Sequence, residues 1–322
     1  MKVLVIRFSS IGDIVLTTPV VRCLKQQVPG AEIHYLTKGA FREIVSHNPH
    51  IDRCHYLEEG WDALRAEHFD LIVDLHHNLR TLRVKRALRV PARSFHKLNA
   101  RKWIYTALKI NLLPPVHIVD RYLATVRSLG VRNDGKGLDY FIPEKDRVGD
   151  KDIPFSHHAG YIGIVIGAAL NTKKLPVSKL RLLCERIEHP IILLGGREDR
   201  DAGDRIAAVD PVKIYNSCGK FGLNESADLV RRAKYIVSHD TGLMHIASAF
   251  RKPILSVWGN TVPAFGMGPY YGDSPAPHRA FEVRPLWCRP CSKIGYDKCP
   301  LGHFKCMERQ DVEAMVRALG LK

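Results

Sequence analysis

Short apolar runs recur along the chain, and most are followed by a stretch whose apolar positions repeat at helical spacing. Uninterrupted apolar runs of this kind are typical of strands buried on both faces of a parallel sheet. The pattern predicts strands at Lys2–Phe8, Glu32–Thr37, Arg53–Leu57 and Asp70–Leu75 in the first half, and at Tyr161–Gly167, Ile191–Gly195, Lys213–Tyr215, Tyr235–Ser238, Pro253–Trp258 and Arg279–Val283 in the second. Strands that alternate with helices in this way predict a doubly wound α/β fold.

The stretch from Val131 to His158 separates these two sets of strands. It is rich in Gly, Asp, Lys and Pro and has no apolar period, which is typical of a linker. The chain has 322 residues, and at about 150 residues per domain that length favours two domains. We therefore expect an N-terminal domain over residues 1–150 and a C-terminal domain over residues 151–322. Chemistry is expected in the loops beyond the carboxyl ends of the strands, where open α/β sheets bind their ligands.

Composition narrows the class of protein. Apolar residues make up 45% of the chain and charged residues 25%, which excludes disorder, collagen and a disulfide-stapled miniprotein. The net charge of +16 predicts a polyanionic partner such as nucleic acid, an acidic membrane surface or a phosphorylated substrate. Eight cysteines are too few for a secreted disulfide framework, and no apolar run is long enough to span a bilayer. With a charge at Lys2 and no signal-peptide pattern, we expect a cytoplasmic protein.

The first loop with candidate chemistry follows the first strand and has the sequence Ser9-Ser10-Ile11-Gly12-Asp13. Hydroxyls, a glycine and a carboxylate at the start of a helix place backbone N–H groups where a ligand can reach them. One interpretation is that Asp13 only caps the helix, a contribution of roughly 1 kcal/mol. In the functional interpretation Asp13 accepts a proton from a hydroxyl nucleophile.

A second loop, Asp240-Thr241-Gly242-Leu243-Met244-His245, joins the strand that ends at Ser238 to a helix that runs to Phe250. Asp240 or Thr241 is expected to cap this helix, and Gly242 leaves its first turn open to a phosphate. A carboxylate repels phosphate unless its oxygens are occupied, and capping would occupy those of Asp240. His245, one turn after Thr241, is either a further ligand or a hydrogen-bonded structural histidine.

The third loop, Gly167–Pro176, combines small residues with donors and charge. Thr172 can donate a hydrogen bond, Lys173 and Lys174 are cationic, and the closing proline is typical of a helix start. After the next strand, Glu198 is placed to accept hydrogen bonds from ribose hydroxyls, as the acidic residue of dinucleotide-binding folds does. The alternative for Glu198 is a solvated charge cluster.

These segments resemble the signature segments of glycosyltransferase family 9, the ADP-heptose:lipopolysaccharide heptosyltransferases. The resemblance is carried by the first loop with the Thr-Thr-Pro after it, by Lys173-Lys174-Leu175-Pro176 and by Asp240-Thr241-Gly242-Leu243-Met244-His245, and it covers nearly the whole chain in order and spacing. It implies a GT-B fold of two facing Rossmann-like domains, with the acceptor mainly in the first and the nucleotide-sugar donor mainly in the second. Leu175 stands where many members have tryptophan, so either Lys173 or Lys174 can be the matching lysine.

The resemblance also implies an activity, namely the inverting transfer of a heptose or related sugar from an ADP-sugar to a lipopolysaccharide inner-core acceptor, with no metal or other cofactor required for catalysis. Asp13 matches the general base, and Lys173 with the Asp240-Thr241-Gly242 turn matches the residues that hold the diphosphate. Helix amides and a lysine can stabilise a leaving diphosphate without Mg²⁺. The remaining expected ligands are Thr172, Glu198 and His245 for the donor and Ser9, Ser10, Gly12, Arg80 and Arg83 for the acceptor.

A long cationic stretch runs from Leu75 to Val119 without a single acidic residue. Its cations are Arg80, Arg83, Lys85, Arg86, Arg89, Arg93, Lys97, Arg101, Lys102 and Lys109. Phe95, Trp103 and Tyr105 interleave with them, which indicates either a nucleic-acid surface or an interfacial membrane patch. For an enzyme acting on a phosphorylated glycolipid such as lipid A–Kdo, we expect peripheral contact with the anionic cytoplasmic face of the inner membrane and no specific nucleic acid.

Four cysteines cluster near the end of the chain, Cys288, Cys291, Cys299 and Cys306, with His303 among them. Cys-x-x-Cys is half of a zinc site, but the second pair has six residues between its cysteines, which no regular zinc ribbon has. A structural zinc, reduced packing thiols and a disulfide all stay open. Two other functions stay open as well: a basic nucleic-acid-binding protein with a cysteine zinc site, and a catalytically silent relative that only binds nucleotide sugar.

Overall fold

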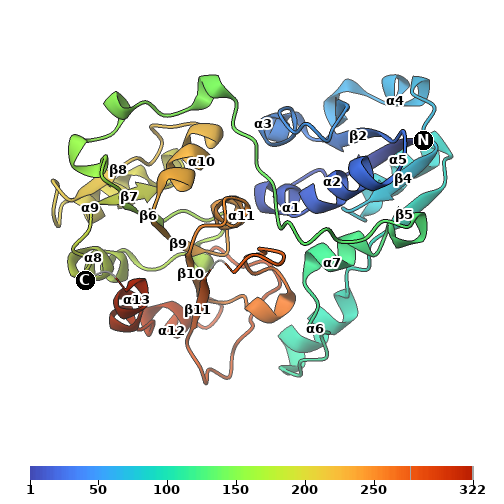
Figure 1. Ribbon diagram of the computed structural model, residues 1–322. Coiled ribbons are helices and arrows are strands. Elements are labelled where there is room, and N and C mark those ends of the chain that lie inside the picture. The colour runs from blue at the N-terminus through green and yellow to red at the C-terminus, as the bar shows by residue number, and fades with distance from the viewer. Residues whose placement is uncertain (276, 321–322) are drawn as a thin grey trace. The chain divides into compact units, whose positions relative to one another are not determined.

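The computed structural model describes residues 1–275 and 277–320 and consists of two compact units (Figure 1). Unit 1 comprises Met1–Lys97, Val116–Pro143 and Tyr270–Ser274, and unit 2 comprises Leu98–Pro115, Glu144–Pro269 and Pro275–Lys322. A single boundary at residue 150 therefore does not describe two segments. Leu98–Pro115 belongs to unit 2 although the residues on both sides of it belong to unit 1, and Tyr270–Ser274 belongs to unit 1 although its neighbours in sequence belong to unit 2. The sequence pattern does not reveal these segments because membership is decided by long-range contacts.

Unit 1 is built on a five-stranded sheet of order β3-β2-β1-β4-β5 in which all pairings are parallel. Its strands are β1 (Lys2–Ile6), β2 (Glu32–Thr37), β3 (Arg53–Tyr56), β4 (Leu71–Asp74) and β5 (Ala92–Ser94). Its helices are α1 (Ile11–Val15), α2 (Thr18–Gln27), α3 (Arg42–Val45), α4 (Asp62–Ala66), α5 (Leu79–Leu88) and α7 (Ile118–Leu123). The central strands β1 and β4 are almost wholly buried, as their uninterrupted apolar sequences require.

Unit 2 is built on a six-stranded sheet of order β11-β10-β9-β6-β7-β8, also parallel throughout. Its strands are β6 (Ile162–Val165), β7 (Ile191–Leu194), β8 (Ile214–Asn216), β9 (Tyr235–His239), β10 (Ile254–Trp258) and β11 (His278–Glu282). Its helices are α6 (Asn99–Leu108), α8 (Val177–Arg186), α9 (Arg200–Ala207), α10 (Leu223–Arg232), α11 (Gly242–Ala249), α12 (Lys305–Glu308) and α13 (Val312–Leu319). The last helix, α13, packs beside α8 (Figure 1).

All ten predicted strands are confirmed to within two residues at each end, and so is the α/β fold class. The sequence analysis missed β5, because it is only three residues long, none of them buried, and it lies inside the cationic stretch. Of the described helices, none is both long and apolar enough to cross a lipid bilayer.

The stretch from Val131 to His158 has no strand and only short helical turns, but it is not a loose linker. Arg22, a buried side chain of α2, pairs with Asp134 at 2.7 Å and with Asp139, and donates to the carbonyl of Gly137 at 2.9 Å. These contacts fix the first part of the stretch to unit 1. In unit 2 the backbone N–H of Val148 donates to the buried carboxylate of Asp228 at 3.1 Å.

All strands of each sheet run parallel, but the order in which the chain adds them reverses once in each sheet. The strand order changes direction between β1 and β4 in unit 1 and between β6 and β9 in unit 2. Loops that follow two such neighbouring strands diverge to opposite faces of the sheet and leave a crevice at the carboxyl ends, which is the usual ligand site of a doubly wound fold. Three of the four loops at these positions are the three loops selected from the sequence.

Candidate active site

Asp13 lies in the loop-to-helix turn after β1, where Arg7 and Ser10 hold its carboxylate. Arg7 Nη2 is 2.7 Å from Asp13 Oδ1, and Ser10 Oγ donates to Asp13 Oδ2 at 2.9 Å. Arg7 is itself buried and fixed, since it donates to the carbonyls of Leu75 at 2.6 Å and Ser9 at 2.7 Å. Because the Asp13 side chain keeps 22% of its surface exposed, it is oriented by the protein and still open to a substrate.

The interpretation of Asp13 as the helix cap is wrong in detail. Ser10 occupies the capping position of α1, and Asp13 lies three residues further, where its carboxylate accepts from the backbone N–H of Ser10 at 3.3 Å. A carboxylate in a first helical turn is stabilised by the helix dipole. Ser9 is half-buried and Gly12 is buried, and whether either contacts an acceptor stays a prediction.

His76, which the sequence analysis did not select, lies beside this group after β4. Its ring centroid is 5.0 Å from that of Phe8, and its buried Nδ1 has no hydrogen-bond partner among the described residues. Burial, followed by the nearby Arg7 charge, lowers the pKa of His76 to about 4, so the ring is neutral at physiological pH. Its position directly after a buried strand, two residues beyond Asp74, was the available sequence signal.

In unit 2, Lys173 and Asp240 join the loops after β6 and β9. Lys173 Nζ is 2.7 Å from Asp240 Oδ2 and 3.3 Å from the Asp240 carbonyl oxygen. Thr261, at the end of β10, donates its hydroxyl to the same carboxylate oxygen at 3.2 Å. Lys173 thus lies at the start of α11, whose capping residue Thr241 makes no side-chain cap hydrogen bond.

The way Asp240 is neutralised differs from the prediction. We expected helix capping, through backbone N–H groups, to occupy its oxygens. Thr241 is the capping residue instead, and the contacts found for Asp240 Oδ2 within residues 1–275 and 277–320 come from Lys173 and Thr261. As a result, the amides of the first turn of α11 are not covered by a capping side chain, and an anion can approach them beside a lysine.

A buried histidine decides which of the two lysines faces Asp240. Nε2 of His239, the last residue of β9, accepts a hydrogen bond from the backbone N–H of Leu175 at 2.9 Å. Burial lowers the pKa of His239 to about 4, which keeps this ring neutral and able to accept. With Leu175 fixed, Lys173 reaches Asp240 while Lys174 reaches the buried Asp199 at 2.7 Å.

The small residues of these loops make room for Asp199. A Cβ added to Gly167 would lie 2.3 Å from Asp199 Oδ2, and one added to Gly195 would lie 2.9 Å from it. The same carboxylate oxygen accepts from the Gly196 backbone N–H at 3.0 Å. At Gly167 and Gly195 the space left by the missing side chain is therefore filled by the protein's own carboxylate.

The other predicted donor ligands lie at different depths. The Thr172 hydroxyl donates to the Tyr296 carbonyl and accepts from the Tyr296 N–H, both at 2.8 Å, so it ties this loop to the C-terminal segment. Glu198 is exposed in the turn after β7, and His245 is buried in α11. Their contacts with a donor stay predictions, as do those of Arg80 and Arg83, which are exposed on α5.

Asn260 is a further residue at this end of the sheet that the sequence analysis missed. It follows β10, immediately before Thr261, and is 2% exposed. Neither Oδ1 nor Nδ2 of its amide has a hydrogen-bond partner among the described residues. A buried amide with four unmet hydrogen bonds is costly in a folded protein, and it commonly marks a place where a ligand or a water completes the structure.

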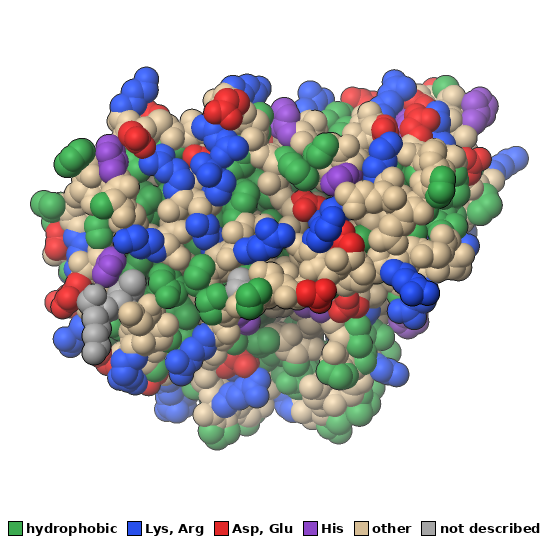
Figure 2. Space-filling model, in the orientation of Figure 1, with side chains coloured by type: hydrophobic (Ala, Val, Ile, Leu, Met, Phe, Trp, Pro, Cys, Tyr) green, Lys and Arg blue, Asp and Glu red, His purple; other side chains and the backbone are tan. Residues whose placement is uncertain are grey.

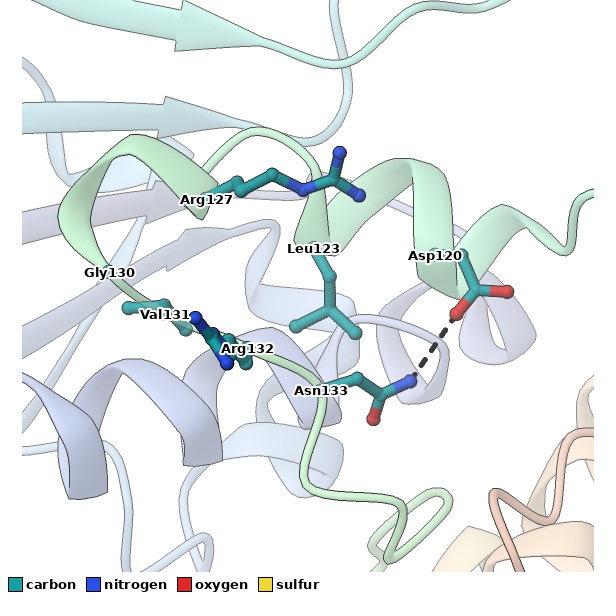
Figure 3. Close-up of a pocket in the computed structure, with 7 residues that line it drawn as sticks. All are labelled: Asp120, Leu123, Arg127, Gly130, Val131, Arg132 and Asn133. Atoms are coloured by element: carbon teal, nitrogen blue, oxygen red, sulfur yellow. Dashed lines mark hydrogen bonds between the residues drawn. The ribbon is translucent and has the colours of Figure 1, made fainter.

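A cavity of about 450 Å³ lies elsewhere in unit 1, between α7 and the turn that follows it (Figure 3). Its lining residues are Asp120, Leu123, Arg127, Gly130, Val131, Arg132 and Asn133. Asp120 is already bonded to Asn133 at 3.3 Å and to the Tyr270 hydroxyl at 3.1 Å. The cavity contains none of the predicted residues, and we assign it no role in the chemistry.

The cationic stretch is divided between the two units. Residues up to Lys97 belong to unit 1, and Leu98–Pro115 belongs to unit 2. Lys85 pairs with the buried carboxylate of Asp74 at 2.9 Å and is therefore a structural cation. The expectation that Phe95 belongs to an interfacial patch is wrong, because its ring is buried and packs edge-on against Tyr122 at 4.8 Å.

The eight cysteines are all free thiols, so the disulfide alternative is not realised. Cys288 Sγ lies 3.8 Å from His303 Nε2, and the Cys291 thiol donates to the Cys288 carbonyl at 3.0 Å. Burial, followed by the neighbouring sulfurs, raises the pKa of Cys291 to about 12. Burial also raises the pKa of Cys306, to about 11. These groups are therefore protonated as long as no metal ion binds them.

One compact set of metal-ligating atoms occurs among the described residues, and it lies in unit 1. His34 Nδ1 is 2.8 Å from His55 Nε2, and Glu67 is the third member. Glu67 is already paired with Lys2 at 2.9 Å and with Arg53. Since its carboxylate is neutralised by two cations, a divalent ion would add uncompensated charge, and we interpret the set as a structural network.

Comparisons with known proteins give matches to the chain in both sequence and structure. The sequence profile of glycosyltransferase family 9 (heptosyltransferase) matches residues 59–296. Lipopolysaccharide heptosyltransferase 2 of Salmonella typhimurium is 26% identical, with 88% of both chains covered. Lipopolysaccharide heptosyltransferase 1 of Pseudomonas aeruginosa is also 26% identical and covers 91% of this chain and 86% of its own. The structure of E. coli heptosyltransferase WaaC with ADP-2-deoxy-2-fluoro heptose matches at a TM-score of 0.67 and 19% identity, covering 99% of each chain.

Proposed function

Because this chain belongs to glycosyltransferase family 9, with the GT-B fold of its structural relatives, we propose that it transfers a heptose or a related sugar from an ADP-sugar to a phosphorylated inner-core glycolipid such as lipid A–Kdo. The transfer inverts the anomeric centre and uses no metal ion. One observation carries the proposal: the Lys173 ammonium lies 2.7 Å from Asp240 at the start of an α11 helix whose capping residue makes no side-chain cap hydrogen bond. Membership in a transferase family also makes the nucleic-acid-binding alternative unnecessary.

The donor site is proposed at the carboxyl ends of β6 and β9, where the strand order of unit 2 reverses. The diphosphate would accept hydrogen bonds from the first-turn amides of α11, at Thr241 and Gly242, and from the Lys173 ammonium. Asp240 does not repel it, because Lys173 and Thr261 already neutralise and hydrogen-bond that carboxylate. As the bond from the anomeric carbon to the diphosphate oxygen breaks, negative charge builds on the leaving ADP, and these same groups stabilise it.

Asp13 is proposed as the general base. The acceptor hydroxyl oxygen forms a bond to the anomeric carbon while its proton passes to the Asp13 carboxylate, so the proton and the leaving group both have a defined destination. Arg7 and Ser10 position Asp13 but do not contact the reacting atoms in this scheme. Attack by the hydroxyl on the face opposite the leaving diphosphate gives the inversion.

Asn260 is proposed as a further donor contact. Its amide is buried without a partner one residue before Thr261, which itself contacts Asp240. A ligand in this site would satisfy that amide, so Asn260→Ala is expected to weaken ADP-sugar binding without lowering the melting temperature of the free protein. Asn224→Ala is the matched control, because that buried amide is already bonded to Asp146 at 2.8 Å. Its loss should destabilise the protein and leave donor binding unchanged.

The test of the proposed function is a transfer assay with purified protein, ADP-heptose and a lipid A–Kdo acceptor, followed by the mass of the product. Thermal-shift measurements with ADP, UDP, GDP and their sugars identify the nucleotide, since stabilisation follows RT ln(1 + [L]/Kd). We expect the adenine nucleotides to raise the melting temperature most. A shift with uridine nucleotides alone would reassign the donor, and donor binding without transfer to any acceptor would indicate a catalytically silent relative.

Two further features are proposals of the same kind. We propose that the protein works at the cytoplasmic face of the inner membrane, in peripheral contact with it. We also propose that Cys288, Cys291, Cys299 and Cys306 hold a structural zinc ion, because soft thiolates are the ligands zinc prefers. Binding would have to draw the four sulfurs together, since among the described residues they do not form a compact set of ligand atoms. Metal analysis of the purified protein should give one zinc per chain, lost in Cys288→Ser but kept in Cys218→Ser, a buried thiol distant in sequence from the cluster.

A further inference from the structure

Residues 98–115 of unit 2 form an unusually apolar part of the surface. Helix α6 buries none of its residues. Trp103 is 61% exposed, and Leu108, Ile110 and Leu112, on and after the end of the helix, are each at least half exposed. Scattered single apolar residues on a surface are ordinary, but four large ones within ten residues of sequence mark a site that contacts something other than water.

The charges around these side chains indicate what that contact is. The cations of this segment are Arg101, Lys102 and Lys109, and there is no acidic residue between Leu75 and Val119. The core of a protein-binding surface is usually depleted of charged residues, whereas exposed tryptophan and leucine among cations of one sign are typical of a segment that lies in the interface of an anionic bilayer.

We propose that residues 98–115 are the membrane-docking element of this protein, with Trp103, Leu108, Ile110 and Leu112 inserted among the lipids and the exposed Arg101 on anionic headgroups. The inference rests on the proposed function in one respect, namely that the acceptor is a membrane glycolipid. It assigns the membrane contact to a defined segment of unit 2 instead of the whole cationic stretch.

The segment is held firmly enough to transmit docking to the rest of unit 2. Lys109 Nζ donates to the Pro290 carbonyl at 2.8 Å, and the Tyr105 ring packs edge-on against Phe265 at 5.9 Å. The loop that contains Pro290 adds two more exposed apolar side chains, Trp287 at 75% and Ile294 at 67%. Figure 1 shows α6 and the loop after β11 at the lower edge of the view, and hydrophobic and cationic side chains gather along that edge in Figure 2.

The other half of the cationic stretch lacks the apolar component. On α5 the cations accompany a single exposed leucine, Leu79, and Phe95 is buried. Such a surface can attract an anion but has little to insert into a bilayer. Within the cationic stretch, docking by insertion is therefore assigned to residues 98–115.

Vesicle flotation tests the proposal, with vesicles containing phosphatidylglycerol compared with neutral phosphatidylcholine vesicles at physiological salt. The test variant is Trp103→Ser with Leu108→Ser and Ile110→Ser. The matched control is Phe155→Ser with Val212→Ser, two side chains of the same unit that are 86% and 78% exposed but lie outside the segment. We expect the test variant to lose at least about tenfold in binding to anionic vesicles, and the control to bind like the unchanged protein.

Transfer to a deacylated, water-soluble acceptor separates this proposal from the proposed function. If docking is assigned correctly, the test variant keeps its rate on the soluble acceptor and loses rate only on acceptor embedded in vesicles. Equal vesicle binding by all three proteins would overturn the docking proposal, whatever the transfer assay gives. So would a fall from dimer to monomer in the test variant, since the apolar face would then be covered by a second copy of the chain.

Discussion

Each sheet has an ion pair of the same kind near the point where its strand order reverses, but the settings of the two pairs differ. In unit 1 the cation is fixed: Arg7 is buried, donates to two carbonyls and contacts Asp13 at 2.7 Å. In unit 2 the cation is a lysine, and among the residues that the structure describes its ammonium contacts Asp240 alone. The carboxylate is the more exposed member in unit 1, whereas the two members are about equally exposed in unit 2.

In the sequence both sites are only loops with charged residues, and the difference between their cations indicates that the two sites have different tasks. A guanidinium whose three nitrogens all have partners can orient a carboxylate but cannot follow a ligand, which suits a positioning residue for a base. An ammonium on a flexible stem, next to open helix amides, can turn toward a phosphate and keep its carboxylate partner nearby. The comparison therefore assigns proton transfer to the first site and charge stabilisation to the second, and the following changes test that assignment.

The largest effect is expected for Asp13→Asn. The amide keeps the shape of the side chain and its contact with Ser10 but cannot accept the proton, so kcat should fall by about a thousandfold. ADP binding, measured by calorimetry, should stay unchanged because the donor loops are in unit 2. A rate within tenfold of the unchanged enzyme would remove Asp13 as the base.

The next effect concerns the neutral histidines beside each site, His76 and His239, whose pKa values burial lowers to about 4. Above pH 6.5 such a ring is neutral in both the folded and the unfolded chain. Between pH 6.5 and 4 the unfolded chain takes up a proton that the folded chain refuses, so the free energy of unfolding falls as the pH is lowered. At about 1.4 kcal/mol per pKa unit, the full loss for His239 is on the order of 3 kcal/mol.

Denaturant unfolding from pH 7 to pH 4 measures this loss. His239→Gln can still accept the hydrogen bond from Leu175 and does not titrate, so its stability should depend less steeply on pH. His47→Gln serves as the control, because that histidine is exposed. An unaltered slope in His239→Gln would show that the acid sensitivity arises at other groups.

A smaller effect distinguishes the two neighbouring lysines. Lys173→Ala removes the cation beside α11 and should weaken ADP binding by at least about tenfold, with little change in melting temperature. Lys174→Ala should leave ADP binding within about threefold but lower the melting temperature, because it strands the buried carboxylate of Asp199. Calorimetry and thermal unfolding of both variants would reveal a reversed pattern, in which case Lys174 is the diphosphate ligand.

The smallest effect is expected at the contact that orients Asp13. Ser10→Ala removes one hydrogen bond to the carboxylate while Arg7 still holds it, so kcat should fall only about three- to tenfold. Ser9→Ala is the comparison, since Arg7 contacts the Ser9 carbonyl oxygen, which remains; loss of a Ser9 contact with the acceptor should appear in KM and not in kcat. Equal losses in both variants would mean that loop flexibility, and not the orientation of Asp13, limits the rate.

The two halves of the cationic stretch illustrate a limit of the sequence pattern. Lys85, Trp103 and Phe95 look equivalent as members of one cationic, aromatic tract. In the structure Lys85 neutralises Asp74, Phe95 is buried, and Trp103 is exposed in the other unit. Burial depends on what packs against a side chain from elsewhere in the chain, and a local pattern contains no such information.

The sequence by itself determined the parallel strands, the α/β class and the three loops with candidate chemistry, because buried strands and helix starts leave local signals in apolar runs, glycines and capping residues. Only the tertiary structure decided that Lys173 and not Lys174 meets Asp240. His239, 64 residues away in sequence, accepts a hydrogen bond from the backbone of Leu175 and so fixes the residue that follows the two lysines. The tertiary structure also decided that Arg7 orients Asp13, and that Asn260 and His76 lie beside the two sites. These outcomes depend on distances between residues far apart in the chain, which are set when the sheets assemble and the loops at their carboxyl ends converge.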